Sequence, residues 1–574
     1  MKKLFTLILL AAAFTTMVTA QVNYQLQSGS TPFSYISGAS AFTWSGSSDD
    51  GYTAATPIGF TFNYCGTDFT EFQASTNGFI RLGSGLTTSL SANTLTGSNR
   101  SIIAPLWDDH AVLDSSADVT YVVTGTAPNR ALTVQWKNVK WRYQNTAPNA
   151  EFQVKLFEGT NTIVFHYGVI TASTSTPTAS IGLVNNTVLT STTNPVTNTF
   201  LSVNIGGLPD APVYHQSMGY AFNSISVAPD TNAYLTFVPV TPTPIAGGTY
   251  VIGPLNQFKS LSEAAMALNI HGIAGPVVIE LPAGTYDDIF HLTDVPGVSA
   301  VNTITFRAIS GNVAILTPLN GSGTSSSTAQ ATSDAMVRLD GTSHVLVQGL
   351  NFINNQQTTN GLKFESAFFV GNSVNPDGTM RNGARFNTFY DLYIDMKSTA
   401  GANVAGATGF RYFTTSSTEV DTGKATSYNT ISNCTILGFW RAGWKSFGIS
   451  GRNPDRGNVI RNCTMGTVDV PTGSGSDVRA VEADCQRDLT IANNTIKDIN
   501  VAIMTTNNIY GIWLNPASSA TNLNSGTINI YGNIIKNLSN SGTTTTSGFA
   551  IGIASNNVDT NTVFNIYNNM ISDI

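Results

Sequence analysis

The sequence predicts an all-β protein, in which an N-terminal β-sandwich is followed by a right-handed parallel β-helix (a solenoid) with an N-terminal capping helix. Three observations support this fold class. Seven segments in the second half share one pattern of an apolar residue, a turn residue and another apolar residue. Short alternating strands separated by turn residues fill residues 24–238. Residues 258–268 form the only segment with a persuasive helical pattern.

The repeated segments are the main signal for the solenoid. Their third positions are Gly, Asn or Asp, which tolerate a sharp bend in the backbone, and β-branched residues flank most of them. Strand, bend and strand, repeated every 29 to 42 residues, are typical of stacked coils. The bend positions are Gly349, Asp391, Asn433, Asn462, Asn493, Gly532 and Asn568. We interpret the Asn members as a ladder of side-chain amides along the stack.

Composition narrows the class of protein. A chain of 574 residues is long enough for two or three domains. Charged residues make up 11%, against about a quarter in soluble proteins generally. A hydrophobic content of 41% argues against disorder. A net charge of −7 without a basic stripe argues against nucleic acid as a partner.

The predicted organisation has four parts. They are a signal peptide at 1–20, a β-sandwich domain at 21–238, a Pro/Gly linker at 239–248 and a parallel β-helix at 249–574. Two lysines, an apolar stretch and a small-residue cleavage site form the signal, and no later segment has 18 apolar residues in a row. We therefore expect a secreted or outer-surface protein without a membrane span.

The two ends of the predicted β-helix differ. Ser260 lies three residues before Glu263, which is capping-box spacing, and the helix at 258–268 would cover the open edge of the first coil. A complete repeat, Ile566–Ile571, ends three residues before the last residue, Ile574. We expect the β-helix to be truncated there, with a C-terminal continuation of the same chain.

Two stretches resemble known extracellular proteins. Residues 249–352 resemble the start of parallel β-helix proteins among secreted bacterial surface proteins of the type IX sorting kind. The matching segments are FKSLSEAAMALNIHGIAGPVVIELPAGTY (258–286), NTITFRA (302–308) and MVRLDGTSHVLVQGLNF (336–352). Residues 24–238 resemble nidogen-type modules. That match is carried by DDGYTAATPIGFTF (49–62), STNGFIRLG (75–83) and IIAPLWDD (102–109). The resemblance implies the architecture and an extracellular location.

A second strand column predicts a ligand-binding face. Four segments align so that Phe410, Trp444, Val481 and Ile512 face the interior. The residues that follow them, Arg411, Lys445, Glu482 and Trp513, should then face outward. Trp513 would offer a flat face to a sugar, and the charged residues would supply hydrogen bonds to an extended glycan.

The densest charges of the predicted β-helix surround this row. They are Arg479, Glu482, Asp484, Arg487 and Asp488, with Arg441 and Lys445 on the preceding coil. The favoured interpretation is that opposite charges satisfy one another on a solvated face. The alternatives are polar ligand binding or catalysis by a polysaccharide lyase or other carbohydrate-active enzyme. All six histidines lie at or before His344, which removes the commonest proton shuttle from the later coils.

Four aspartates and two cysteines each have two possible interpretations. Asp49, Asp50, Asp108 and Asp109 are most simply turn residues, with calcium binding as the alternative. Cys434 and Cys463 occupy equivalent positions in adjacent repeats and should stack as small buried side chains, with a disulfide or a metal pair as the alternative.

The sequence therefore predicts a non-enzymatic, adhesin-like or glycan-binding surface protein. Its expected partner is an extracellular polysaccharide or a host or cell-surface glycan. No catalytic residue is predicted, because no complete catalytic constellation appears in the sequence.

Overall fold

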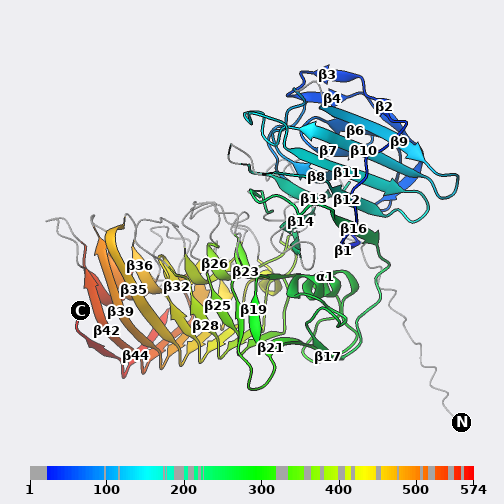
Figure 1. Ribbon diagram of the computed structural model, residues 1–574. Coiled ribbons are helices and arrows are strands. Elements are labelled where there is room, and N and C mark those ends of the chain that lie inside the picture. The colour runs from blue at the N-terminus through cyan, green and yellow to red at the C-terminus, as the bar shows by residue number, and fades with distance from the viewer. Residues whose placement is uncertain are drawn as a thin grey trace, which may run out of the picture.

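The computed structural model describes most of the chain beyond the predicted signal peptide, which lies outside the described residues. The described residues are 22–95, 99–113, 117–171, 175, 177–186, 200–204, 212–217, 221–223, 225–318, 334–354, 364–374, 380–397, 407–414, 420–447, 454–474, 477–503, 508–514, 524–540, 548–556 and 562–574. Figure 1 shows a sandwich of strands beside a stack of coils.

The N-terminal part is a sandwich of two antiparallel sheets in the described residues. The seven-stranded sheet runs in the order β1 (Tyr24–Ser30), β16 (Ala233–Pro239), β12 (Ile163–Tyr167), β11 (Ala150–Phe157), β10 (Ala131–Val139), β9 (Asp118–Thr124) and β2 (Ser40–Ala41). The nine-stranded sheet runs in the order β15 (Val213–Ser217), β14 (Phe200–Asn204), β13 (Ser180–Val184), β8 (Ile102–Trp107), β7 (Phe79–Leu82), β6 (Thr67–Ser75), β4 (Gly51–Thr53) and β3 (Trp44–Gly46), with β5 (Thr56–Tyr64) paired to β6. Trp136 and Phe152 stack in the buried layer between the sheets.

The C-terminal part winds into coils whose strands form three parallel sheets in the described residues. The first sheet contains β17 (Gly248–Val251), β18 (Val277–Leu281), β21 (Ile304–Ala308), β24 (Val345–Gln348), β27 (Thr388–Tyr390), β30 (Thr430–Ser432), β34 (Val459–Arg461), β38 (Thr490–Ala492), β41 (Thr527–Tyr531) and β44 (Val563–Tyr567). The second contains β19 (Gly284–Tyr286), β22 (Ala314–Leu316), β25 (Asn351–Ile353), β28 (Tyr393–Asp395), β31 (Thr435–Leu437), β35 (Thr464–Ser474), β39 (Thr495–Ile503), β42 (Ile534–Asn540) and β45 (Met570–Ser572).

The third parallel sheet carries the candidate site. It contains β20 (Phe290–Thr293), β23 (Ala335–Asp340), β26 (Ser366–Gly371), β29 (Thr408–Phe413), β32 (Ala442–Phe447), β36 (Val478–Asp484), β40 (Ile509–Leu514) and β43 (Ala550–Ser555). A short pair, β33 (Asp455–Arg456) and β37 (Gln486–Arg487), lies at a corner, and one 3-10 turn spans Thr422–Lys424. The predicted parallel β-helix is confirmed.

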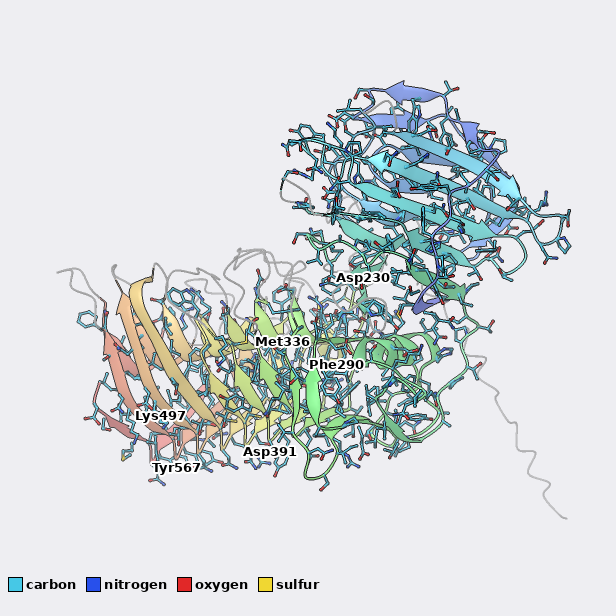
Figure 2. The ribbon with its side chains drawn as sticks, viewed as in Figure 1. Asp230, Phe290, Met336, Asp391, Lys497 and Tyr567 are labelled. Carbon is cyan, nitrogen blue, oxygen red and sulfur yellow. The ribbon has the colours of Figure 1, made fainter. Side chains whose placement is uncertain are left out.

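The repeated bend positions line up at one corner of the coils. Asn433, Asn462 and Asn493 all have a left-handed backbone, with φ of 55° to 56°, between strands that pair in register. Figure 2 shows Asp391 and Tyr567 several coils apart along the same edge of the β-helix. The sequence therefore located this corner correctly.

The amide ladder lies one residue beyond the bends, so its predicted position was wrong. Asn533 accepts from the backbone N–H of Asn494 and donates to the backbone oxygen of Ile491 at 2.9 Å. Asn569 continues the ladder by accepting from Asn533. The reason is geometric, because a side chain at the left-handed bend points out of the coil whereas the next one points inward.

The capping helix α1 (Leu261–His271) begins three residues later than predicted. Ser260 is its N-cap and accepts from the backbone N–H of Glu263 at 3.1 Å, so residues 258–260 lie before the first turn. The buried carboxylate of Asp288 also accepts from the backbone N–H of Leu261 at 2.5 Å. These acceptors satisfy N–H groups that a helix start leaves unpaired.

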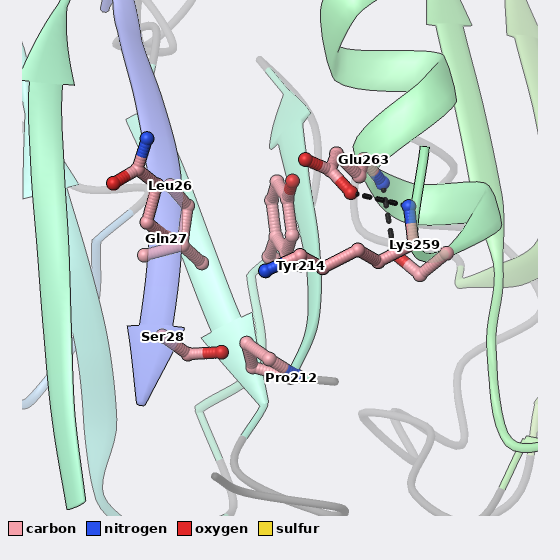
Figure 3. A pocket seen from close by; sticks show the side chains of 8 residues that line it. Leu26, Gln27, Ser28, Pro212, Tyr214, Lys259 and Glu263 are labelled. Carbon is pink, nitrogen blue, oxygen red and sulfur yellow. Dashed lines mark hydrogen bonds between the residues drawn. The ribbon is translucent and has the colours of Figure 1, made fainter. Parts of the chain in front are cut away.

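The sandwich contacts the β-helix through this cap. Helix α1 packs against β15 and β1 of the sandwich and against β20 of the first coil. An open hollow of about 320 Å³ lies between them, lined in part by Tyr214, Lys259 and Glu263 (Figure 3). Both domains supply its polar side chains, and on the cap the carboxylate of Glu263 accepts from the backbone N–H of Lys259 at 2.6 Å. The hollow is therefore part of the contact between the two domains.

Candidate functional site

The candidate site lies on the outward face of the third sheet. Phe410, Trp444, Val481 and Ile512 pair in register from β29 to β40 and lie fully buried in the core of the coils, as predicted. Arg411, Lys445, Glu482 and Trp513 pair in register one position later. Neighbouring residues of a strand point to opposite faces, so this second column points out of the coil.

The prediction that the opposite charges pair with one another is confirmed, but the prediction that their face is solvated is wrong. Arg411 and Glu482 are each 3% exposed, Lys445 is 7% exposed and Trp513 is 8% exposed. Charges this far from water are stable only if they are paired and hydrogen-bonded. The column is therefore a buried polar network outside the apolar core.

Glu482 is the centre of this network. Its carboxylate lies 3.2 Å from Lys445 Nζ, 2.5 Å from Arg479 Nη1 and 3.9 Å from Arg441 Nε. Arg479 also pairs with Asp477 at 2.5 Å. Burial alone would raise the pKa of Glu482, but Lys445, Arg479 and Arg441 outweigh it and hold the pKa at about 2. Glu482 is therefore ionised throughout the physiological range.

Lys445 and Asp484 have pKa values close to neutral pH. Burial lowers the pKa of Lys445 to about 8, with Arg441, Arg479 and Arg411 acting in the same direction and Glu482 opposing them. Burial raises the pKa of Asp484 to about 7, and the charge of Glu482 adds to the rise. Both groups can therefore exchange protons at ordinary pH.

Several polar atoms around Glu482 have no side-chain hydrogen-bond partner. They include the donors Nε of Arg441, Nε of Arg479 and Nε1 of Trp513, all buried. No side chain donates to either carboxylate oxygen of Asp484. Buried polar groups are normally paired, and leaving one unpaired costs about 1–3 kcal/mol. The network therefore contains both unused donors and unused acceptors.

Trp513 does not form the predicted sugar platform. Its ring stacks on Tyr510 with centroids 4.3 Å apart, and the guanidinium of Arg479 lies 4.3 Å from its centroid. Because it is only 8% exposed, it presents no flat face to solvent. Its indole N–H is buried and has no hydrogen-bond partner.

Arg487 is not part of the network. It lies in β37 at a corner of the coil, its side chain is 46% exposed and it pairs loosely with Asp488 at 3.6 Å. The structure thus joins Arg411, Lys445, Arg479, Glu482, Asp484 and Trp513 on the outward face and leaves Arg487 outside.

Sequence reasoning missed the head of the same column. His291 on β20 pairs in register with Arg338 on β23, and the column continues through Phe369 to Arg411. His291 Nε2 lies 2.6 Å from Asp340 Oδ2, and Arg338 Nε donates to the same oxygen at 2.7 Å. The predicted column began at Arg411, after His344, so it did not include His291. Aligning FHLT (290–293) with VRLD (337–340) would have revealed it.

The four aspartates of the sandwich divide into two roles. Asp108 is buried and accepts from Trp141 Nε1 at 3.0 Å and Arg142 Nη1 at 3.1 Å. Burial raises the pKa of Asp49, and the charges of Asp109 and Asp50 raise it further, so these three carboxylates lie near one another. Within the described residues, no group of three or more His, Cys, Asp or Glu side chains is arranged to hold a metal ion. Calcium binding here stays a prediction.

Cys434 and Cys463 are free thiols in buried positions. Cys463 Sγ lies 3.2 Å from the backbone oxygen of Arg461, and Cys434 Sγ lies 3.3 Å from that of Ser432. This arrangement agrees with the interpretation of stacked small side chains.

Comparisons with known proteins address the two halves separately. A family model described as "NIDO related" matches residues 23–239, the sandwich. No curated protein matches the chain. Within the described residues, no helix is long and apolar enough to cross a membrane.

Three solved structures show weak similarity to the chain. A pectin methylesterase in complex with a hexasaccharide is 11% identical, covering 52% of this chain and 80% of its own, with a TM-score of 0.24. The A-module of the Azotobacter vinelandii mannuronan C-5 epimerase AlgE6 is 11% identical, covering 54% and 94%, with a TM-score of 0.21. A tailspike capsular polysaccharide depolymerase from an Acinetobacter baumannii bacteriophage is 10% identical, covering 66% and 70%, with a TM-score of 0.23. At these scores, no functional inference follows from them.

Proposed function

We propose that this is an extracellular, non-enzymatic glycan-binding protein whose ligand is held on the outward face of the third sheet around Glu482. The observation that carries the proposal is the mixture of unused donors and acceptors there. Arg441, Arg479 and Trp513 each have a buried N–H without a hydrogen-bond partner, and the carboxylate oxygens of Asp484 accept no side-chain hydrogen bond. A sugar hydroxyl both donates and accepts, so a polyol can satisfy both kinds of group at once.

The ionic core of the network supports binding. Glu482 is fixed by Lys445 on the adjacent coil and by Arg479 on its own strand, and all three side chains are less than 10% exposed. Groups that are locked before the ligand arrives lose little conformational entropy on binding. The β-helix strands hold this geometry because each is hydrogen-bonded to a coil on either side.

The proposed location is the outer cell surface or the extracellular medium. The signal-like residues 1–20, the low content of charged residues and the nidogen-type resemblance of the sandwich support it. The type IX route of export belongs to this proposal. An environmental polysaccharide or a host or cell-surface glycan is the expected partner.

A binding experiment with a matched pair of variants tests the proposal. The protein is screened against an array of neutral and acidic glycans, and affinities for the bound ones are measured by calorimetry. Asp484→Asn should weaken binding about tenfold or more, because a charged hydrogen bond contributes about 1.5–3 kcal/mol. Asp488→Asn is the control, since Asp488 is 54% exposed at the corner and Asn tolerates its left-handed backbone. Equal losses in both variants, or no glycan bound at all, would reject the proposal.

A second candidate function, polysaccharide lyase, is favoured by one observation. The pKa of Lys445 is lowered to about 8 by burial, and that of Asp484 is raised to about 7 by burial. A neutral Lys445 could take the proton from the carbon beside a sugar carboxylate. The electron pair left behind forms a carbon–carbon double bond, the glycosidic bond breaks and protonated Asp484 gives its proton to the departing oxygen.

Turnover separates the two candidates. Polygalacturonate, alginate and glycosaminoglycans are incubated with the protein, and unsaturated products are followed by ultraviolet absorbance. Product formation that Lys445→Gln abolishes would establish the lyase and overturn the non-enzymatic proposal. Binding without product would leave the glycan-binding function in place and reject the lyase.

A further inference from the structure

Arg441 differs from the other basic residues of the network. Its guanidinium is 3.9 Å from Glu482, beyond hydrogen-bond distance, and its buried Nε has no acceptor. Its side chain is 22% exposed, compared with 9% for Lys445 and 4% for Arg479. Of these three cations, Arg441 is therefore the most exposed and makes the longest contact with Glu482.

Charge around Arg441 is unbalanced within the described residues. Arg441, Lys445 and Arg479 surround Glu482, and Asp477 supplies a second carboxylate through Arg479. Asp484 is a third carboxylate of this network, but burial raises its pKa to about 7, so it is only partly ionised near neutral pH and does not fully balance the three cations. The pKa of Arg441 is lowered by burial and by the neighbouring charge of Arg479, which Glu482 and Asp477 oppose. An anion beside Arg441 would relieve this repulsion.

The positions of Arg441 and Asp484 along the strands indicate how a bound ligand would be oriented. Arg441 directly precedes β32, at the edge where strands of the third sheet begin. Asp484 is the last residue of β36, at the opposite edge of the sheet. Lys445 and Glu482 lie between them on adjacent coils. A ligand that reaches both ends would place an anionic group at one end and hydroxyls at the other.

We propose that the ligand of this network is an acidic sugar whose anionic group is received by the guanidinium of Arg441. The planar fork of an arginine donates two parallel hydrogen bonds to a carboxylate or a sulfate ester, so either anion fits the chemistry. The hydroxyls of the sugar then reach Asp484 and the indole N–H of Trp513. This inference rests on the proposed glycan-binding function and names its substrate class.

The experiment compares ligands that differ in charge alone. Affinities are measured for oligogalacturonate, its methyl ester, and a sulfated and an unsulfated glycosaminoglycan oligosaccharide. The wild type should bind oligogalacturonate about tenfold more tightly than its uncharged methyl ester, or the sulfated glycosaminoglycan about tenfold more tightly than the less charged unsulfated one, and added salt should reduce the difference. The carboxylate and sulfate arms distinguish the two sources of the anion.

Variants assign this preference to Arg441. Arg441→Gln should remove the preference for the acidic ligand, and Arg441→Lys should restore part of it because the charge returns without the fork. Arg487→Gln, an exposed arginine at the corner, is the matched control and should keep the preference. Circular dichroism and the unfolding temperature verify that each variant folds.

The outcomes separate this inference from the function beneath it. If charged and uncharged ligands bind equally well, or if Arg441→Gln and Arg487→Gln behave alike, the inference is overturned and glycan binding stands. If no glycan of either kind binds, the proposed function is overturned together with it.

Discussion

Replacing Glu482 with Gln tests whether the buried network is held together by its single central carboxylate. The amide has nearly the same shape but no charge, so Lys445 and Arg479 lose their shared anion. Both cations remain buried, and Glu482 itself is 3% exposed. Removing one partner of a buried ion pair typically destabilises a protein by about 3–5 kcal/mol, because an uncompensated charge remains.

The pKa of Glu482 gives an independent magnitude. In the folded chain the pKa falls from 4.5 to about 2, despite burial, because three cations stabilise the carboxylate. Each pKa unit corresponds to about 1.4 kcal/mol, so the ionised form gains about 3 kcal/mol of stability. The two routes agree, and Glu482→Gln should lower the free energy of unfolding of the β-helix by about 3 kcal/mol.

The assay is chemical denaturation followed by tryptophan fluorescence and circular dichroism, with the β-helix transition analysed separately from the sandwich. Glu280→Gln is the control, because Glu280 pairs with Arg307 across adjacent coils at 2.7 Å but on a more exposed surface. That substitution should cost less than about 1 kcal/mol. Equal effects of the two substitutions would refute the reasoning that burial makes the Glu482 network critical.

Three further predictions concern other parts of the molecule. The free energy of unfolding should fall as the pH rises from about 5 to 8, because burial raises the pKa of Asp455 to about 7 and the folded state therefore holds more protons. Urea titrations across that pH range should show the fall, and Asp455→Asn should reduce its slope, with Asp484 and Asp288, whose pKa values burial also raises, supplying the remainder. Asn533→Ala should cost about 1–3 kcal/mol by leaving backbone groups of neighbouring coils unpaired, and calorimetry should show a lowered unfolding temperature. Calcium should raise the unfolding temperature of the sandwich, Asp109→Asn should remove the effect, and an unchanged temperature would reject calcium binding.

Glu482 gives the free energy of unfolding the opposite pH dependence in the acidic range. Glu482 has a depressed pKa, so its contribution is complete above its unfolded pKa of 4.5 and disappears as the pH falls towards about 2. Asp455 contributes in the opposite sense, since its folded pKa lies above its unfolded value. Together these two groups predict greatest stability at about pH 4, between the unfolded pKa of Asp455, 3.8, and that of Glu482, 4.5. A stability maximum at alkaline pH would contradict both assignments.

The fold was predictable because its determinants are local. A bend residue between two apolar residues specifies a corner, and the corners at Asn433, Asn462 and Asn493 appear where the sequence placed them. The capping helix was also found, with a start displaced by three residues because Ser260 caps the helix instead of continuing it. Alternation along the strands placed Phe410 inside and Arg411 outside.

The sequence predicted which residues of the candidate site pair in register, but it did not predict that they are buried. Pairing of adjacent coils put Arg411, Lys445, Glu482 and Trp513 in one column, as the alignment indicated. Burial of an outward face depends on how the rest of the chain packs over it, and no period in the sequence carries that information. The amide ladder was displaced by one residue for a related reason, since a bend and an inward side chain are adjacent in the sequence.

Hydrogen–deuterium exchange of the full chain, with and without a bound glycan, tests the central claim most directly. A ligand held around Glu482 should slow exchange in β32, β36 and β40 and leave the sandwich strands unchanged. Protection confined to the sandwich, or to the first or second sheet of the β-helix, would contradict a binding site on the outward face of the third sheet.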